Sequence, residues 1–247
     1  MKKLILVSFA LLTTASINAQ SSWSLGLGVS SLANYSDYSG GMANANGNFH
    51  HDDYGTGAFN FVARKTINPH WSFQTGFGFS SVGFNFTITQ DYSLLNPDGQ
   101  YTGNSIECNT VVLPATIVYN TNLTCRNWRW FIGGGLSFIS HSNEKDDDVE
   151  MDVMDNSSIA NLTQSYDFNG GFTLNGHLIG GIEKVFRNQS ILSFGLIGSL
   201  GTSTVGTTSV SYTLDGTDYN HSFTNRGNYF GCYINYYFRP LGSKKAK

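Results

Sequence analysis

The chain has 247 residues, of which only 13% are charged, about half the share of roughly 25% found in an average soluble domain. Aromatic residues make up 14%, and the formal net charge is −3 at pH 7. A chain this rich in aromatic and β-branched residues is not intrinsically disordered, and without a basic patch it is not expected to bind nucleic acid. After residue 19 no stretch approaches the roughly 18 consecutive apolar residues of a transmembrane helix, which excludes a helical membrane protein.

The amino end has the pattern of a secretory signal peptide. Lys2 and Lys3 form a positive segment, residues 4–12 form an apolar segment, and Ala19 precedes a plausible cleavage point before Gln20. The apolar segment is too short to span a membrane as a helix. We therefore expect residues 1–19 to be a signal peptide and the chain to be exported.

Three cysteines, Cys108, Cys125 and Cys232, are an odd number for an exported protein. Cys108 and Cys125 fall near opposite ends of one expected strand, about 55 Å apart at ~3.3 Å per residue. That separation is far beyond the reach of a disulfide, so no intramolecular disulfide framework is expected.

The body of the chain alternates with period two, which indicates β-strands. In residues 71–79 the odd positions are apolar, whereas the even positions are small or polar. In residues 82–88 the apolar side moves to the even positions. A β-bulge near Ser80 and Ser81 would keep one continuous apolar face, and we expect one there.

Counting these runs predicts eight strands separated by short and long connections in strict alternation. The short connections are 68–70, 121–127 and 187–189, and the long ones contain the hairpin dipeptides Asn46-Gly47, Asp98-Gly99 and Asp215-Gly216. Apolar residues flank the last dipeptide, so the last two strands are expected to continue beyond the bilayer. The expected strands are 22–34, 56–67, 71–88, 106–120, 128–141, 168–186, 190–206 and 225–239.

The fold class expected is all-β, an eight-stranded antiparallel transmembrane β-barrel with short periplasmic turns and long external loops. It would occupy residues 20–239 and be followed by a basic tail, 240–247. The charges agree with this orientation. Of the twelve Lys and Arg outside the signal segment, all except Lys145 and Arg226 lie toward the short-turn end, where Glu183 is the single acidic residue.

Several strands resemble those of the outer-membrane β-barrel family common in Bacteroidota, which is porin-like and of the PorT type. Residues 111–119, Val-Val-Leu-Pro-Ala-Thr-Ile-Val-Tyr, are similar to its L-x-I-P-L-x-L-K-Y strand. Residues 130–136 resemble its Y-x-G-G-G strand, 170–183 its glycine-rich F-G-L-N-x-G-x-G-x-E segment, and 225–238 its closing strand. The chain departs from the pattern at Leu113 and in the basic tail after Phe238. The resemblance implies an outer-membrane location and a role in envelope assembly.

The sequence offers few candidates for catalytic or metal-binding residues. In the third long loop, oxygen ligands recur at Asp146, Asp148, Glu150 and Asp152 as in a calcium-binding loop, but Met151 stands where a sharp turn needs glycine. These four residues are the metal-ligand candidates, and an acidic surface loop is the alternative. The His-His-Asp-Asp run at 50–53 fits a solvated loop tip.

Acyl-transfer chemistry would draw on His141 and Ser142 with Asp155, or on His177 with Glu183. No nucleophile motif supports it, and His177 and Glu183 would lie about 20 Å apart on the same face of one strand. No catalytic residue, no cofactor and no enzymatic activity are therefore expected.

Eight strands enclose an interior that side chains fill, whereas open aqueous channels need about sixteen. Small residues expected on the inner face leave some room: Gly76, Gly78, Gly133, Gly135, Gly195 and Gly201. The function expected is a structural, surface-interaction or envelope-assembly role without a wide pore. A narrow small-solute channel, a lipid-modifying enzyme and, at the level of the fold, a secreted β-sandwich are the alternatives. The partners expected are outer-membrane lipids and, through the acidic loops, other envelope proteins or external ligands.

Overall fold

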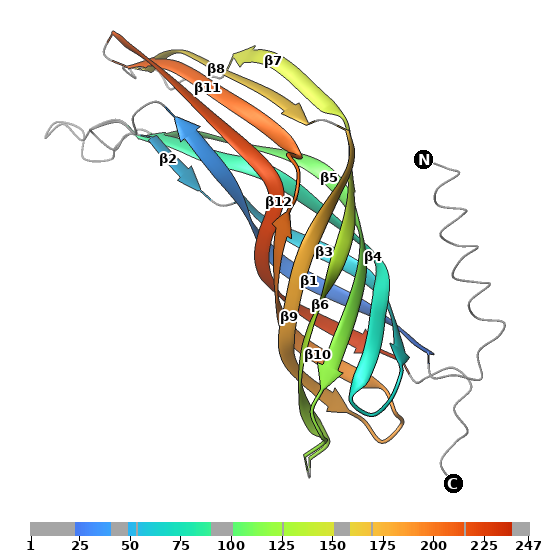
Figure 1. The fold of residues 1–247 in the computed structure, drawn as a ribbon. Coiled ribbons are helices and arrows are strands. Elements are labelled where there is room, and N and C mark those ends of the chain that lie inside the picture. The colour runs from blue at the N-terminus through green and yellow to red at the C-terminus, as the bar shows by residue number, and fades with distance from the viewer. Residues whose placement is uncertain are drawn as a thin grey trace, which may run out of the picture.

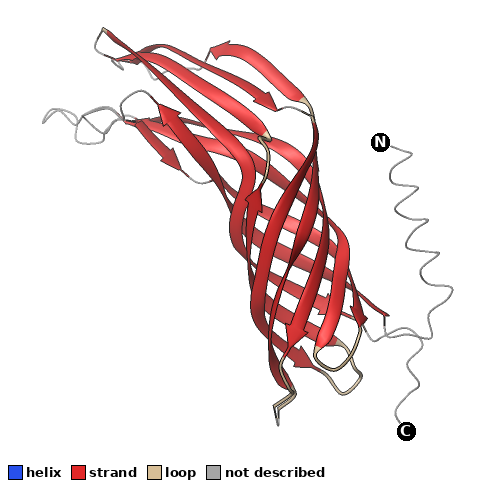
Figure 2. Ribbon diagram, in the orientation of Figure 1, coloured by secondary structure: helices blue, strands red, loops and turns tan. Residues whose placement is uncertain are grey.

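The computed structural model describes residues 23–40, 49–52, 54–89, 101–124, 126–150, 159–168, 170–214 and 216–238, and every regular element among them is a β-strand (Figure 2). No helix in this part of the chain is long and apolar enough to cross a membrane. The expected signal peptide, Cys125 and the basic tail lie outside the described residues.

Eight long strands form a closed antiparallel barrel, which confirms the expected fold (Figure 1). Each strand pairs with the next in the barrel, and β1 closes it on β12 from Gly26↔Tyr237 onward. The barrel strands are β1 (Trp23–Gly40), β3 (Tyr54–Thr66), β4 (Trp71–Thr89), β5 (Tyr101–Asn120), β6 (Trp128–His141), β9 (Gly171–Val185), β10 (Ile191–Gly201) and β12 (Thr217–Tyr237).

Four further strands extend the barrel at its long-loop end: β2 (Phe49–Asp52), β7 (Glu144–Glu150), β8 (Ile159–Phe168) and β11 (Gly206–Leu214). β2 pairs with β4, while β7, β8 and β11 pair in that order and join the upper part of β12. The expected hairpin at Gly216 is present, with Tyr212 opposite Tyr219. We call this part the outer extension: the four strands together with the upper ends of β1, β4, β5 and β12.

Breaks in the strand pairing mark the boundary between the barrel and the outer extension. The register of β1 with β12 shifts between Tyr35 and Ser36, and residues 202–205 separate β10 from β11. Gly227 in β12 has a φ of 72°, a left-handed conformation that glycine adopts without strain. These irregularities let the upper strands lean away from the barrel axis (Figure 1).

The outer surface of the barrel suits contact with lipid. Outward-facing positions carry large apolar side chains that remain exposed, among them Leu25, Phe79, Leu178 and Leu200. Exposed aromatic residues gather toward the short-turn end: Trp71, Tyr119, Trp130, Tyr236 and Phe238. An apolar band bounded by aromatic side chains is the surface that an outer-membrane barrel presents to the bilayer.

The expected bulge at Ser80 and Ser81 is wrong. β4 keeps one register with β5 on both sides of that point, from Thr75↔Ala115 to Thr89↔Tyr101. The even-numbered residues of β4 therefore face inward throughout, and Phe84 is only 1% exposed whereas outward Phe79 is 50% exposed. It is the character of the inner face that changes, from polar in the barrel to aromatic in the outer extension.

The inward aromatic residues of β4 belong to an apolar core inside the outer extension, which we call the outer cluster. It joins β4 and β5 on one side to β8, β11 and β12 on the other. Its members are Val82, Phe84, Phe86, Ile88, Cys108, Leu162, Phe168, Val205, Val210, Tyr212 and Phe223. Beyond the bilayer the strands meet water outside, so their apolar side chains pack inside as in a soluble protein.

We expect Phe84→Ala to lower the free energy of unfolding by about 3–5 kcal/mol, because it opens a cavity in a packed core. Phe79→Ala is the matched control, since lipid occupies the space that its ring leaves, and it should cost less. Urea unfolding of the barrel in lipid vesicles measures both. Equal losses would contradict the inward placement of Phe84.

Candidate functional site: the barrel interior

A buried ion-pair network crosses the lumen near the short-turn end. Glu183 on β9 forms ion pairs with Arg64 on β3 and with Arg129 on β6. The Arg129 contact joins Nη2 to Oε2 at 2.8 Å, and Ser193 Oγ donates to Oε1 at 2.7 Å. Arg64 and Glu183 are 1% and 0% exposed, so both charges are withdrawn from water.

Further contacts extend this network around the barrel wall. Arg64 Nη2 donates to Asn120 Oδ1 at 2.9 Å, and its guanidinium lies 5.7 Å from the centre of the Tyr237 ring. Asn120 Nδ2 in turn donates to the carbonyl of His70 in the turn between β3 and β4. We call this set, with Arg129, Glu183 and Ser193, the floor network. It ties strands on opposite sides of the barrel together across the lumen.

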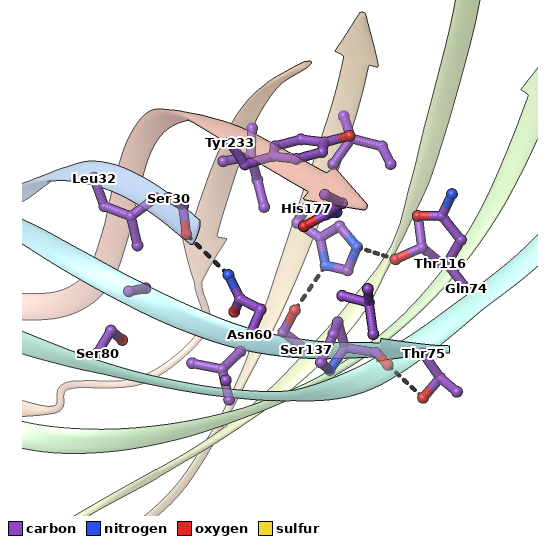
Figure 3. Close-up of a pocket in the computed structure, with 18 of the residues that line it drawn as sticks. Ser30, Leu32, Asn60, Gln74, Thr75, Ser80, Thr116, Ser137, His177 and Tyr233 are labelled. Carbon is purple, nitrogen blue, oxygen red and sulfur yellow. Dashed lines mark hydrogen bonds between the residues drawn. The ribbon is translucent and has the colours of Figure 1, made fainter. Parts of the chain in front are cut away.

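Above the floor network, His177 on β9 is held by two hydroxyl groups (Figure 3). Its Nε2 lies 2.7 Å from Thr116 Oγ1 and its Nδ1 lies 2.8 Å from Ser137 Oγ. A neutral imidazole has one donor and one acceptor, so one hydroxyl accepts a hydrogen bond from the ring and the other donates one. Both ring nitrogens are thus engaged in holding the ring.

A cavity of about 110 Å³ lies beside His177 in the middle of the barrel, and we call it the central chamber (Figure 3). No charged side chain is among the residues that line it. Its polar lining comes from Ser30, Asn60, Gln74, Thr75, Ser80, Thr116, Ser137, His177 and Asn235, and its apolar and aromatic lining from Leu32, Ala58, Val62, Gly78, Val112, Pro114, Ile179, Ile197, Tyr229, Tyr233 and Tyr237.

The inward-facing glycines leave less room than their number suggests, because side chains of neighbouring strands lie over them. A Cβ built at Gly195 would lie 2.7 Å from the Tyr233 ring, and one at Gly78 would lie 2.2 Å from Asn60 Oδ1. These glycines let large side chains of the next strand fold into the lumen. The central chamber lies beside one of them, Gly78.

The outer end of the central chamber is covered by apolar side chains. Leu32, Ile139 and Tyr229 pack together above it, and the outer cluster follows in the outer extension. There Phe49 stacks on His221 with ring centres 4.0 Å apart. Burial lowers the pKa of the His221 imidazole, which favours its neutral form in this apolar setting.

Of the four metal-ligand candidates, the structure describes the side chain of Asp146 alone, so the predicted cation site stays a prediction. Asp146 is an exposed residue of strand β7, and its pairing with β8 shifts register before Val149. Asp148 and Glu150 lie on the same strand, but their side chains, and all of Asp152, are outside the described residues. Among the side chains that can be placed, no group of three His, Cys, Asp or Glu could hold a metal ion.

The described side-chain contacts of the acyl-transfer candidates do not join them into one set. Ser142 Oγ donates to Glu144 Oε1 at 2.7 Å and lies 3.2 Å from Cys108 Sγ, whereas neither described contact involves His141. His177 and Glu183 share the inner face, as expected, but belong to different networks. Residues 50–52, expected at a loop tip, belong instead to strand β2. Their side chains, residue 53 and Asp155 lie outside the described residues. Cys108 and Cys232 are free thiols.

Sequence reasoning missed the floor network, although one signal for it was visible. Glu183 is the single acidic residue among the basic residues of the short-turn end. A lone carboxylate on the inner face of a strand needs a cation to compensate its burial, and Arg64 and Arg129 are inward by the same alternation. To predict that these side chains form ion pairs across the lumen, one needs the register of the barrel strands, which the sequence alone does not supply.

Among known proteins, the chain is similar to one family model and to several solved structures. The model of the family described as outer membrane protein beta-barrel domain matches residues 18–203. The crystal structure of the outer membrane protein OprG from Pseudomonas aeruginosa is 11% identical with a TM-score of 0.41, over 90% of this chain and 100% of that one. The solid-state NMR structure of the outer membrane protein AlkL is 12% identical with a TM-score of 0.43, over 92% of this chain and 94% of that one. No curated protein matches the chain.

We expect Glu183→Ala to destabilise the barrel by about 3–5 kcal/mol, because it leaves two buried arginines without their counter-charge. Asp146→Ala is the matched control, since an exposed carboxylate on β7 should matter by less than about 0.5 kcal/mol. Unfolding in urea from lipid vesicles gives both values. A loss for Glu183→Ala no greater than that of the control would contradict the floor network.

Proposed function

Because the chain belongs to the outer membrane protein beta-barrel domain family, we propose that it is an outer-membrane platform without a wide pore. Its role is structural, or lies in surface interaction or envelope assembly. The barrel fixes the chain in the membrane, and the outer extension projects from it. The chain reaches this membrane through its amino-terminal signal peptide, residues 1–19.

One observation carries the proposal: the lumen is filled at both ends of the central chamber. The floor network crosses it toward the short turns, and Ile139, Tyr229 and the outer cluster cover it on the other side. An eight-stranded barrel has an interior about the size of its own side chains, so such contacts leave no wide passage.

Envelope assembly is included among these roles because the barrel strands resemble those of the PorT-type family of Bacteroidota. Outer-membrane lipids contact the apolar band, and other envelope proteins or external ligands bind through the acidic loops. The outer extension offers them an ordered surface, because it has its own apolar core.

We propose no enzymatic activity. His177, the histidine in the lining of the central chamber, has both ring nitrogens bonded to hydroxyl groups of the barrel wall, which supports a structural role. A narrow small-solute channel is the second candidate, and the central chamber of about 110 Å³ is the observation that favours it.

Planar-bilayer recording tests the platform against the channel. We expect the purified barrel, checked for folding by its heat-dependent gel mobility, to produce no conductance steps above those of a detergent blank. A sixteen-stranded porin inserted under the same conditions is the positive control. Small, reproducible steps would support the narrow channel instead, and steps as large as those of the porin would contradict both.

A further inference from the structure

Three adjacent strands, β6, β9 and β10, present large and small residues to the membrane in a regular pattern. β9 lies between the other two in the barrel wall (Figure 1). Its Leu178 is 72% exposed and stands directly opposite Gly134 on β6 and Gly198 on β10. Along β9 itself, the next outward positions on either side are Gly176 and Gly180. Leu178 is therefore a large apolar side chain with a glycine on each of its four sides.

The alternation continues on both flanking strands. Gly176 and Gly180 each stand opposite a large apolar residue on β6 and another on β10. These residues lie diagonal to Leu178, and all are exposed: Ile132, Leu136, Leu196 and Leu200. Raised side chains and glycine hollows thus alternate both along the strands and across them. We call these nine residues the glycine–leucine face.

The fold itself does not require three of these glycines. A Cβ built at Gly176 would meet no atom within 4 Å, and one at Gly180 or Gly198 would meet nothing closer than 3.7 or 3.8 Å. Glycine weakens a strand, because it has more conformational freedom to lose and no side chain to pack. Within a strand it often marks a place where another backbone approaches closely. A partner at the outer surface of the barrel would explain these hollows.

The outer face of β3 and β4 is built differently, because its large side chains pack on one another. The ring of Phe61 contacts those of Phe59 and Phe77, and Phe77 contacts Phe79, with ring centres 4.7–5.8 Å apart. Lipid chains can cover such a continuous surface without gaps. On the glycine–leucine face, lipid chains must enter separate hollows and lose conformational freedom there, so release of lipid favours a protein partner.

The outer surface of these three strands is large enough for a stable interface. Its outward positions in residues 130–138, 172–182 and 194–200 carry no charge that would oppose the approach of a partner. An aromatic side chain has roughly 150–250 Å² of surface, and an aliphatic one somewhat less. The exposed side chains here therefore offer on the order of 1,000 Å² per copy, more than the ~800 Å² that each partner contributes to a standard interface. They are 37–72% exposed: Trp130, Ile132, Leu136, Phe138, Phe172, Leu178, Phe194, Leu196 and Leu200.

We propose that the glycine–leucine face binds a second copy of this chain, so that two barrels form a homodimer in the membrane. A surface of alternating raised side chains and hollows is complementary to a copy of itself displaced by one position. The leucines of each copy then enter the glycine hollows of the other. Such association is driven by close van der Waals packing at small residues, because lipid is as apolar as the protein surface. A symmetric pair closes after two copies. The dimer does not depend on the platform role.

Energy transfer between labelled copies tests the pairing. The mature chain carries a donor or an acceptor dye at its amino end, and the two preparations are folded together in phosphatidylcholine vesicles. We expect energy transfer above that calculated for randomly placed barrels at the same surface density, and we expect the excess to persist as the protein is diluted with lipid. Energy transfer equal to the random value at every dilution would overturn the proposal and leave lipid as the occupant of this face.

Filling the hollows locates the interface. Gly176→Leu and Gly198→Leu each place a side chain where a leucine of the second copy would lie, whereas the barrel itself has room for it. Overpacking of a close contact should weaken dimerisation by about tenfold or more. Gly57→Leu is the matched control on the exposed outer face of β3, where a Cβ also meets no atom within 4 Å. An equal loss in the control, or no loss in the two variants, would overturn this face as the interface.

Leu178→Ala tests the other half of the contact, because it removes a raised side chain and adds nothing that could clash. We expect it to weaken dimerisation by about tenfold, as for a cavity left in a packed contact. Leu25→Ala, on the exposed outer face of β1, is the control and should leave dimerisation unchanged. Heat-dependent gel mobility confirms that every variant is folded. Dimerisation of Leu178→Ala equal to that of the native chain would overturn the packing of leucine into glycine hollows.

Discussion

Pairing of every backbone N–H and C=O is the constraint on which this structure depends, since hydrocarbon offers no water to hydrogen-bond them. An open sheet would leave two unpaired edges in the bilayer. The pairing of β1 with β12 removes both edges and converts eight strands into a wall. The outer extension is free of this constraint. Its strands β7 and β2 can therefore end a sheet, as they do, where water satisfies the backbone.

The same boundary between lipid and water explains why the inner face changes character along one strand. Inside the bilayer, lipid contacts the apolar side chains, and the lumen receives the small and polar ones, such as Ser72 and Gln74 on β4. Beyond it, water surrounds the strands, so the apolar side chains turn inward without any change of register. The rings of Phe84 and Phe86 are therefore buried in the outer cluster. β4 thus contributes to two different interiors: a polar lumen within the bilayer and an apolar core in the outer extension.

Alternation and turn length were sufficient to predict the eight barrel strands, and the predicted ranges 71–88 and 128–141 match the observed strands to within a residue at both ends. They could not predict the direction of the apolar face in 82–88, because period two identifies two faces but not which one meets lipid. Strand β7 was not predicted, for a different reason. Its acidic residues 144–150 have low strand propensity, and only pairing with β8 makes them a strand. The floor network and the central chamber could not be predicted either, because both depend on the register between strands that are distant in sequence.

The strongest described contacts inside the barrel lie toward the two ends of the lumen. The floor network crosses the lumen at one end with buried charges, and the outer cluster fills the other with interlocked rings. Moving either would expose unpaired charge or open a large cavity. At Pro114 the wall has instead already lost part of its ladder, and a single threonine hydroxyl compensates one carbonyl. A proline is costly within a central strand. Here that cost is confined to one position, because β4 and β5 keep the same register on either side of it, at Thr75↔Ala115 and at Gly78↔Val112.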